Sequence, residues 1–393
     1  MNSTGIRSHQ RTRFCYAAAQ PGISSPPVAT SAQPQLGALR DQFPVLATRA
    51  YLNAGTDGPL PAGAVQAAGE ELARAAREGR THHHFERRAE LREELRAAYA
   101  ALLGCAPGDV ALTTCTSEGL ALVIDGLGLA PGDEILTSDE EHPGLLGALA
   151  AARDVRGARI RIAPWSELPA AVSADTRLVA CSHVSWMSGR LAPGALAQLD
   201  VPVLLDGAQG VGAVPTQVGA LRCAAYAGAG QKWLCGPDGT GMLYVSPELR
   251  ERLAVTRRGY GNLANPGAGL QASLQPDARR LDTFSLSAEA LACALGALQV
   301  LAAGGWDAVH VRAAALAEQL AGRLRAAGRE VTPRDGTTLV TFSSADPVGE
   351  RERLAEAGVI LRDIPERPAL RASVGAWNDE DDLARLIDAL DAS

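Results

Sequence analysis

Seven short apolar runs of strand length, most of them separated by helical patterns, constrain the fold of this chain more than any other feature. Between residues 109 and 245 they read DVALTT, DEILTS, ARIRIA, TRLVACS, VPVLLD, CAAYAGA and TGMLYV. Intervening segments such as 118–129 and 143–154 carry apolar residues at helical spacing. Apolar strands interleaved with helices form a mostly parallel sheet covered on both faces. The sequence therefore predicts an α/β fold with a mostly parallel seven-stranded sheet.

The remainder of the chain predicts a smaller α+β domain. A helical pattern over 306–327 leads into three further apolar runs and a closing helical pattern over 379–391. We predict a large domain over 61–304 and a small domain formed by 41–60 together with 305–393. The first 40 residues contain four arginines and no Asp or Glu. We interpret them as a disordered N-terminal extension.

Charge and cysteine usage disfavour several classes of function. Because 37 Lys and Arg stand against 44 Asp and Glu, the net charge is −7 and no basic footprint for nucleic acid is present. The seven cysteines form no CxxC pair, which indicates reduced thiols and a cytoplasmic protein. No apolar run reaches transmembrane length. We expect no metal at His82–His84, since adjacent histidines diverge, and favour a polar lining of a site mouth there.

Lys232 is the only lysine in the chain, against 36 arginines. Arginine stays protonated in proteins, whereas a desolvated lysine can lose its proton and attack a carbonyl to form a Schiff base. A chance surface lysine is the alternative. Because the chain uses arginine at all other Lys or Arg positions, its single lysine favours a chemical role for Lys232.

Other polar residues follow the ends of predicted strands. Asp206 ends one strand, His142 follows another, and Thr116 and Ser117 follow a third strand and open a helix. In open α/β sheets, ligands bind beyond the carboxyl ends of the strands. A carboxylate there suits a protonated pyridine nitrogen, and a helix N-terminus with hydroxyls suits phosphate. Each residue also has an ordinary structural reading: a turn, a buried histidine or a capping box.

Taken together, these motifs resemble the class V aminotransferase family of pyridoxal-phosphate (PLP) enzymes with fold type I. The resemblance runs from residue 43 to the C-terminus, with anchors in EHPG, SHVSWMSG, LLDGAQGVG, AGQKWLCGPDGTGMLYV and RASVGAWNDEDDL. It implies a homodimer that binds PLP and acts on an amino acid. The roles it implies are Schiff-base formation by Lys232, pyridinium binding by Asp206, ring contacts by Gln209 and His142, phosphate binding by Thr116 and Ser117, and carboxylate binding by Arg371.

The chain departs from the family pattern before the lysine. Where the family has Ser or Thr, then Gly, then His, this chain has Ala229, Gly230 and Gln231. Gln231 can donate a hydrogen bond to the phosphate but adds no charge. Ser285 lies where the family often borrows a Thr from the partner subunit. By the same resemblance, Asn53 and Trp186 are expected to contact substrate.

The stretch before Arg371 separates the branches of the family. Cysteine desulfurases carry a catalytic cysteine there, but residues 358–373 of this chain, GVILRDIPERPALRAS, contain none. The sequence resembles the cystine and cysteine-conjugate C–S lyases and the isopenicillin-N-epimerase-like branch. We predict β-elimination from cystine, cysteine or a cysteine S-conjugate without an enzyme persulfide. An epimerase or aminotransferase is the alternative, ahead of a desulfurase or a non-catalytic PLP-binding protein.

Overall fold

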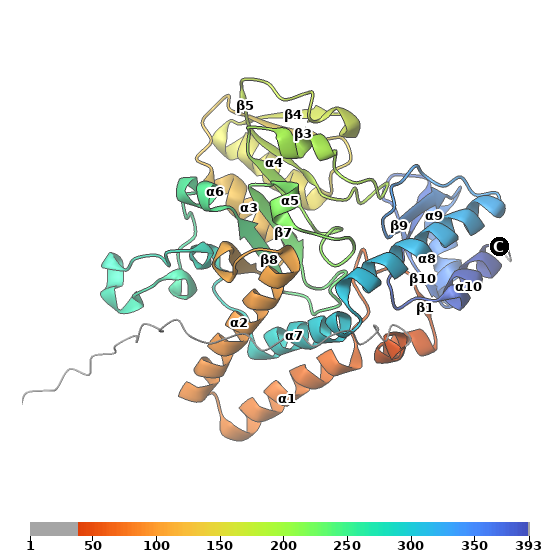
Figure 1. The fold of residues 1–393 in the computed structure, drawn as a ribbon, viewed down its shortest axis with the longest axis horizontal. Helices are drawn as coiled ribbons and strands as arrows, with labels where there is room; N and C mark the ends of the chain where they lie inside the picture. The colour runs from red at the N-terminus through yellow and green to blue at the C-terminus, as the bar shows by residue number, and fades with distance from the viewer. Residues whose placement is uncertain (1–37, 392–393) are drawn as a thin grey trace, which may run out of the picture. The chain divides into compact units, whose positions relative to one another are not determined.

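The computed structural model describes residues 38–391, in which a seven-stranded sheet carries helices on both faces (Figure 1). The strands are β1 (Ala50–Tyr51), β2 (Val110–Thr113), β3 (Glu134–Ser138), β4 (Arg159–Ala163), β5 (Thr176–Ser182), β6 (Val203–Asp206), β7 (Ala225–Ala229), β8 (Gly241–Val245), β9 (Leu339–Ser343), β10 (Val359–Ile360), β11 (Arg362–Asp363) and β12 (Ala369–Ser373). The α-helices are α1 (Ala62–Glu78), α2 (His82–Leu103), α3 (Thr116–Gly126), α4 (Pro143–Arg156), α5 (Val218–Leu221), α6 (Pro247–Arg252), α7 (Ala288–Ala303), α8 (Trp306–Ala326), α9 (Pro347–Glu356) and α10 (Glu380–Asp391).

The large sheet has the strand order β2-β8-β7-β6-β5-β3-β4. Only β8 runs antiparallel to its neighbours, β2 and β7. The seven strands coincide with the seven apolar runs of the sequence, so the predicted fold class is confirmed. Because β2, β3, β6 and β7 are parallel, the segments that follow them emerge at one edge of the sheet.

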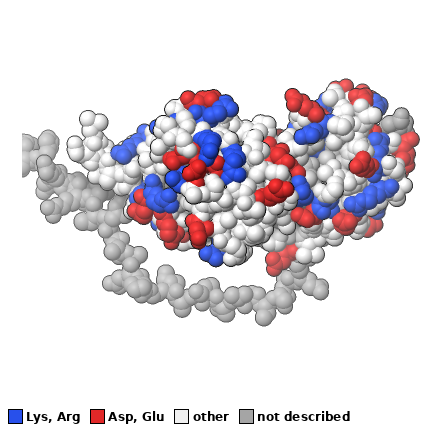
Figure 2. Space-filling view, turned by 90° about the horizontal axis from the view of Figure 1, so that it is seen from above, with Lys and Arg blue, Asp and Glu red and all other residues white. Residues whose placement is uncertain are grey.

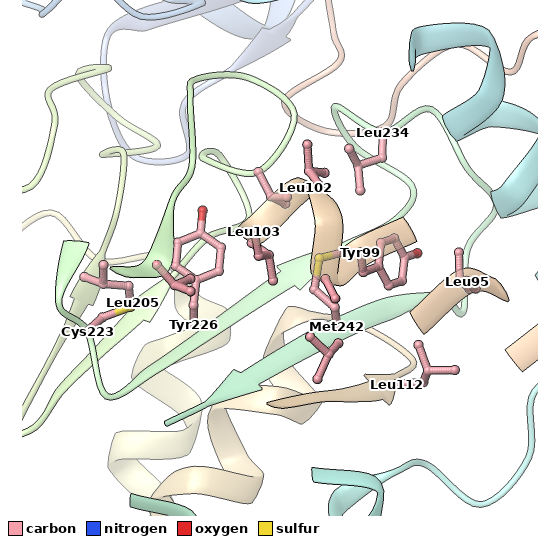
Figure 3. Close-up of a cluster of buried hydrophobic side chains, with 14 of the residues drawn as sticks. Leu95, Tyr99, Leu102, Leu103, Leu112, Leu205, Cys223, Tyr226, Leu234 and Met242 are labelled. Carbon is pink, nitrogen blue, oxygen red and sulfur yellow. The ribbon is translucent and has the colours of Figure 1, made fainter. Parts of the chain in front are cut away.

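Alternate residues of the strands face two separate hydrophobic layers. Along β8, Met242 belongs to one layer and Leu243 to the other. Figure 3 shows the first layer, where Tyr99 and neighbouring leucines of α2 pack against Tyr226 of β7 and Met242. The other layer is covered by α3 and α4. Burial on both faces explains why the strands read as continuous apolar runs.

Helix α7 is the one long helix that the sequence pattern did not predict. Its residues are apolar on nearly all sides, and most of them are buried. It packs against both α1 and α2. A helix enclosed in this way has no polar face, and so it lacks the periodic signal that reveals a surface helix.

Two smaller sheets lie in the remainder of the described chain. The strands β11, β12 and β9 form one antiparallel sheet, in which Arg362 pairs with Arg371. The short strand β1 pairs with β10 in parallel, which joins residues 50–51 to residues 359–360. This contact agrees with the proposed grouping of residues 41–60 with the C-terminal part. The domain boundaries themselves stay a prediction.

The chain is packed from the first described residues. Leu39 is buried, and Arg40 forms an ion pair with Asp382 of α10 at 2.7 Å. Residues 38–40, for which the sequence predicts a disordered extension, are thus part of the fold. The remainder of that predicted extension, residues 1–37, lies outside the described residues.

The surface mixes both signs of charge. Figure 2 shows basic and acidic side chains interspersed over the face it presents. Many of them form local pairs, such as Arg153 with Asp154 on α4. Among the described residues, no single helix is long and apolar enough to cross a membrane. Helices α7 and α8 meet that test only as a pair, and the pair is bent by 79°.

Candidate active site

A cavity of about 310 Å³ lies at the carboxyl edge of the large sheet. Eight of the residues predicted for the site line it together: Thr116, Ser117, His142, Asp206, Gln209, Gln231, Lys232 and Arg371. They come from segments far apart in the sequence that follow β2, β3, β6 and β7, and from strand β12. This is the sheet edge at which open α/β folds bind their ligands.

Asp206 is the last residue of β6 and is almost fully buried. Its Oδ1 accepts a hydrogen bond from the backbone N–H of Ala208 at 2.9 Å. Burial raises the pKa of Asp206, although this hydrogen bond and the charge of Lys232 act in the other direction. A carboxylate in such a place is stabilised by a cationic partner. Asp206 can therefore hold a protonated ring nitrogen.

Lys232 follows β7 and reaches the same cavity. Burial lowers the pKa of Lys232, with Arg371 and Arg362 adding to this effect, while Asp206 and Asp57 oppose it. A lysine with a lowered pKa has a larger fraction of neutral amine at neutral pH. Neutral amine is the form that attacks a carbonyl or accepts a proton.

His142 caps the N-terminus of α4, with its Nδ1 accepting a hydrogen bond from the backbone N–H of Gly144 at 3.0 Å. An accepting Nδ1 carries no proton, so the ring is neutral with its proton on Nε2. Burial and the cationic Lys232, Arg362 and Arg371 lower the pKa of His142 to about 4. Its ring meets Trp186 edge-on, with centroids 5.1 Å apart. His142 is thus a neutral, fixed aromatic wall.

The N-terminus of α3 forms the polar end of the cavity. Thr116 and Ser117 open this helix, whose first backbone N–H groups have no partner within it. The Thr116 Oγ1 and Gln231 Oε1 atoms are buried and have no hydrogen-bond partner in the described part of the chain. A Cβ on Gly144 would lie 2.5 Å from Ser117 Oγ, so the N-termini of α3 and α4 approach each other closely. Hydroxyls and free amides of this kind fit a phosphate.

Gln209 joins the cavity wall to the turn after β1. Its Nε2 donates to the carbonyl of Gly55 at 2.7 Å, and its Oε1 accepts from Trp233 Nε1 at 3.0 Å. One proton of the amide group remains for a ring oxygen. A Cβ on Gly55 would lie within 2.9 Å of Gln209, Ser373 and Arg371. Only glycine fits this turn against the site without displacing one of them.

Two arginines enter the cavity from the small antiparallel sheet. Arg371 on β12 is fully buried, and its Nη1 donates to the carbonyl of Trp186 at 2.9 Å. Its Nε and Nη2, which lie on one edge of the guanidinium, have no hydrogen-bond partner within residues 38–391. Burial and the neighbouring Arg362 lower the pKa of Arg371 to about 9, which leaves it charged at neutral pH. A carboxylate can bind this edge through two parallel hydrogen bonds.

Three predicted residues lie away from the cavity wall. The Asn53 side chain accepts from Thr56 Oγ1 at 2.8 Å, and its backbone bridges to Ser373. Trp186 is buried behind His142, where it holds Arg371 through its carbonyl. Ser285 is exposed and does not line the cavity of its own chain. The sequence thus identified neighbours of the site in Asn53 and Trp186, but neither contacts the cavity.

The expectation that His82–His84 line the site mouth is wrong. His82 and His83 lie exposed in the first turn of α2, and both contact Glu86. None of the three lines the cavity. The first turn of a helix directs such side chains toward residues three and four positions on, here Glu86.

Several lining side chains were not predicted as site residues from the sequence, among them the polar and charged Thr56, Asp57 and Arg362. Arg362 lies opposite Arg371 in the β11–β12 pair, and its guanidinium lies over the Trp186 ring at 5.7 Å. Two arginines placed either side of the short turn IPERPA were the available signal. Asp57 lies within the motif YLNAGTDGPLP, but no pattern within that motif shows which residues face the cavity.

Comparisons with known proteins identify the family of this chain. The family model described as aminotransferase class-V matches residues 50–386. Isopenicillin N epimerase from Streptomyces clavuligerus is 28% identical over 386 residues, which cover 87% of this chain and 94% of that protein. A probable cysteine desulfurase from Pseudomonas aeruginosa is 33% identical over 319 residues, covering 73% of this chain and 78% of the relative.

Solved structures support the same family assignment. The cystine C–S lyase C-DES, in complex with its reaction product cysteine persulfide, has a TM-score of 0.84 and 26% identity, covering 89% of this chain and 99% of that one. A lysine-to-alanine variant of C-DES, with glycine covalently linked to its PLP cofactor, has a TM-score of 0.85 and 27% identity, covering 89% and 98%. The cofactor of this chain is pyridoxal 5′-phosphate, and the chain belongs to the class-V aminotransferase family of fold type I PLP enzymes.

Proposed function

We propose that this protein is a carbon–sulfur lyase that removes sulfur from a cysteine-derived disulfide, with L-cystine as the model substrate, and forms no persulfide on the enzyme. The observation that carries the proposal is the β11–β12 pair. It brings two guanidinium groups into one cavity, and its connecting turn contains no thiol. Two cationic groups suit a substrate with two carboxylates, and a missing thiol leaves no acceptor for sulfur in this turn.

The residues present fit PLP. Asp206 would hold the ring nitrogen, the remaining Gln209 amide proton would meet the ring oxygen, and the His142 ring would lie against the pyridine. Thr116, Ser117 and the N-terminus of α3 would hold the phosphate. When bound, PLP supplies an electron sink that stabilises negative charge at the substrate α-carbon. The Thr116 hydroxyl, which can donate and is buried without a partner among the described residues, agrees with a phosphate at this end.

Lys232 moves the proton in the proposed reaction. Its lowered pKa makes the neutral Nζ available to take the proton from the α-carbon. Arg371 would hold the α-carboxylate through its free Nε and Nη2 edge. This contact would fix the direction of the Cα–H bond relative to Lys232 and the ring, because proton removal needs that bond perpendicular to the ring plane.

The sulfur leaves on a small molecule. As the α-proton departs to Lys232, the Cβ–S bond breaks and its electron pair stays on sulfur. From cystine this releases thiocysteine, and the three-carbon fragment takes up water to give pyruvate and ammonia. Cystine and one water are thus converted to thiocysteine, pyruvate and ammonia, with no net oxidation or reduction. Arg362, farther from the buried end than Arg371, would hold the second carboxylate.

The thiols of the described chain support release of sulfur to solution. Among the described cysteines, only Cys115 lines the cavity, and it begins α3 as the N-cap residue. Burial raises the pKa of Cys181 and of Cys235, which keeps both protonated and unreactive at neutral pH. A persulfide-forming enzyme needs a reactive thiolate that reaches the substrate sulfur. We therefore expect single Cys→Ser replacements to leave turnover within a few-fold.

The deciding experiment measures three products in parallel. Purified protein is supplied with L-cystine, L-cysteine and an S-alkyl cysteine, and pyruvate, thiol or persulfide release and loss of optical rotation are recorded. We expect pyruvate from cystine, and Arg371→Ala should lower kcat/KM by about 100-fold, with effects on both kcat and KM. Exchange of the α-proton with no sulfur release from any substrate would contradict the lyase.

Epimerisation is the second candidate, favoured by the 28% identity to isopenicillin N epimerase over most of both chains. It shares α-proton removal by Lys232 but needs a proton donor on the opposite face of the substrate. The neutral His142 carries a proton on Nε2 and lies in the same cavity. Racemisation of an added amino acid without pyruvate would support this outcome. Amino transfer to a keto acid would instead indicate an aminotransferase.

A further inference from the structure

The cavity contains one acidic group that the proposed reaction does not use. Asp57 lies in the turn after β1 and lines the cavity together with Lys232 and Arg362, and its carboxylate is close enough to both of them and to Asp238 for their charges to shift its pKa. Among the described residues, its carboxylate has no hydrogen bond or ion pair; its backbone N–H donates to the carbonyl of Asn53 at 3.2 Å, and its carbonyl accepts from Tyr51 Oη at 2.9 Å. Asp57 is therefore a free negative charge in a binding cavity.

Arg362 is its free positive counterpart. The Nε of Arg362 donates to the carbonyl of Asp363 at 3.0 Å, and the guanidinium lies over the Trp186 ring. These two contacts fix the side chain, while within the described chain its terminal nitrogens form no ion pair or hydrogen bond. Asp57 and Arg362 line the same cavity without pairing with each other. Two opposite charges that are held apart can each bind a group of a ligand placed between them.

The three charged side chains differ in burial, and this difference indicates how a substrate would lie in the cavity. Arg371 is fully buried, Arg362 is half-buried, and Asp57 is exposed. A substrate whose reacting carboxylate meets Arg371 therefore extends past Arg362 toward Asp57. The group at its far end meets one cation and one anion. An α-amino acid carries a carboxylate and an ammonium on the same carbon, which matches this pair.

We propose that Asp57 is a specificity residue that binds the ammonium of a second α-amino acid unit at the far end of the substrate, beside the carboxylate bound by Arg362. This proposal rests on the proposed function and narrows its substrate class to bis-amino acids joined through sulfur. Substrates that lack the distal ammonium leave Asp57 unpaired next to Asp238. The enzyme therefore discriminates against S-alkyl cysteines and against disulfides with a simple thiol acid.

The test uses three disulfides that share the reacting L-cysteine unit. L-Cystine has both distal charges, the mixed disulfide with 3-mercaptopropionate has only the carboxylate, and the mixed disulfide with cysteamine has only the ammonium. Dissociation constants are read from the absorbance change of the bound cofactor, and α-proton exchange into deuterated water is followed with pyruvate release. The variants are Asp57→Asn, Asp57→Glu and, as a matched control, the exposed neighbour Asp238→Asn.

Asp57→Asn should weaken binding of cystine and of the cysteamine disulfide by about tenfold, a typical loss for one charge-assisted contact. Binding of the mercaptopropionate disulfide should change less than about twofold, and Asp57→Glu should restore part of the lost affinity. Equal weakening of all three ligands, or unchanged cystine binding, would overturn the proposal. Selective weakening with α-proton exchange but no pyruvate would support the subsite and refute the lyase, so the two failures are distinguishable.

Discussion

The Nδ1 atom of His142 accepts a hydrogen bond from the backbone N–H of Gly144 at 3.0 Å, so one side chain both begins helix α4 and forms a wall of the active site. Substitution can separate the capping role of His142 from the role of its ring in the active site. Asparagine also caps helices well but has no aromatic ring, whereas alanine does neither.

We therefore expect His142→Ala to lower the free energy of unfolding by about 1 kcal/mol through loss of the cap. His142→Asn should recover most of that stability. Both variants should lose activity to a similar extent, because both lack the ring. Urea unfolding and pyruvate assays on the two proteins measure the separate effects. Full activity in His142→Asn would show that capping is the only role of this residue.

The lone lysine gives the second prediction. Purified protein should be yellow, and borohydride reduction should attach the cofactor irreversibly to the peptide that contains Lys232. Lys232→Arg retains the charge but cannot lose its proton to form the bond. Peptide mass spectrometry after reduction compares the two proteins. Covalent attachment in Lys232→Arg would mean that another group, not this lysine, holds the cofactor.

The altered phosphate end gives the third prediction. Gln231 stands where the family has His, and its Oε1 is buried without a partner. A charge-assisted hydrogen bond contributes about 1.5–3 kcal/mol, so Gln231→His should slow cofactor loss by roughly tenfold or more. Dialysis followed by the residual absorbance of the bound cofactor measures this retention. Unchanged or faster loss from the variant would indicate that a group outside this chain already supplies the charge.

Two buried glutamates should respond to pH in opposite directions. Burial raises the pKa of Glu141 to about 7, despite hydrogen bonds from Ser138 and Ser182, and Asp206 adds to the shift. The Arg161 guanidinium instead holds the pKa of Glu134 at about 2. Stability linked to Glu141 is present below its usual value of 4.5 and is lost as the pH rises to about 7. Stability linked to Glu134 is present above 4.5 and is lost as the pH falls toward 2.

Glu141→Gln should therefore gain stability relative to the unmodified protein as the pH rises from about 4.5 to 7. Glu134→Gln should lose about 1–3 kcal/mol at neutral pH and should approach the unmodified protein only in acid. Urea unfolding of the three proteins across this pH range gives the curves. Parallel curves for all three would show that neither carboxyl has a shifted pKa.

A homodimer is the last prediction. The segment between α6 and α7 stands out from the large sheet (Figure 1) and exposes Tyr260, Leu270 and Phe284 next to Ser285. We expect a second copy to cover these side chains. Leu270→Glu should therefore weaken the dimer in analytical ultracentrifugation. Val155→Glu on α4, also exposed but on another element, should not. A monomeric unmodified protein would contradict the expectation that Ser285 serves a partner's site.

The large sheet and the chemical end of the site could be predicted because their signals are local. All strands of this sheet except the edge strand β4 are largely apolar runs, and Asp206 ends such a run while His142 and Lys232 follow one within a few residues. The position of Arg362 depends instead on which residue it opposes in the β11–β12 pair. Helix α7 was missed for a related reason: its environment is set by α1 and α2, far away in the sequence.

Asp57 is an example of a site residue that its sequence motif does not identify. Its motif was recognised, but neighbours in one turn differ in whether they face the cavity, as Asp57 does, or bond within the turn, as Asn53 does. His82 and His83 show another error, since polar residues on an exposed helix turn can pair with a local partner such as Glu86 and lie away from the cavity. In both cases the direction of the side chain depends on tertiary packing.

The two ends of the cavity are formed by two different sheets. The residues proposed to bind the cofactor follow strands of the large sheet, whereas Arg362 and Arg371 belong to the small sheet made of β9, β11 and β12. Substitution or grafting of the β11–β12 turn can therefore change which molecules are accepted while the residues that hold the ring and phosphate stay in place. The β11–β12 hairpin is therefore the segment to exchange when a different substrate selectivity is wanted with the same catalytic residues.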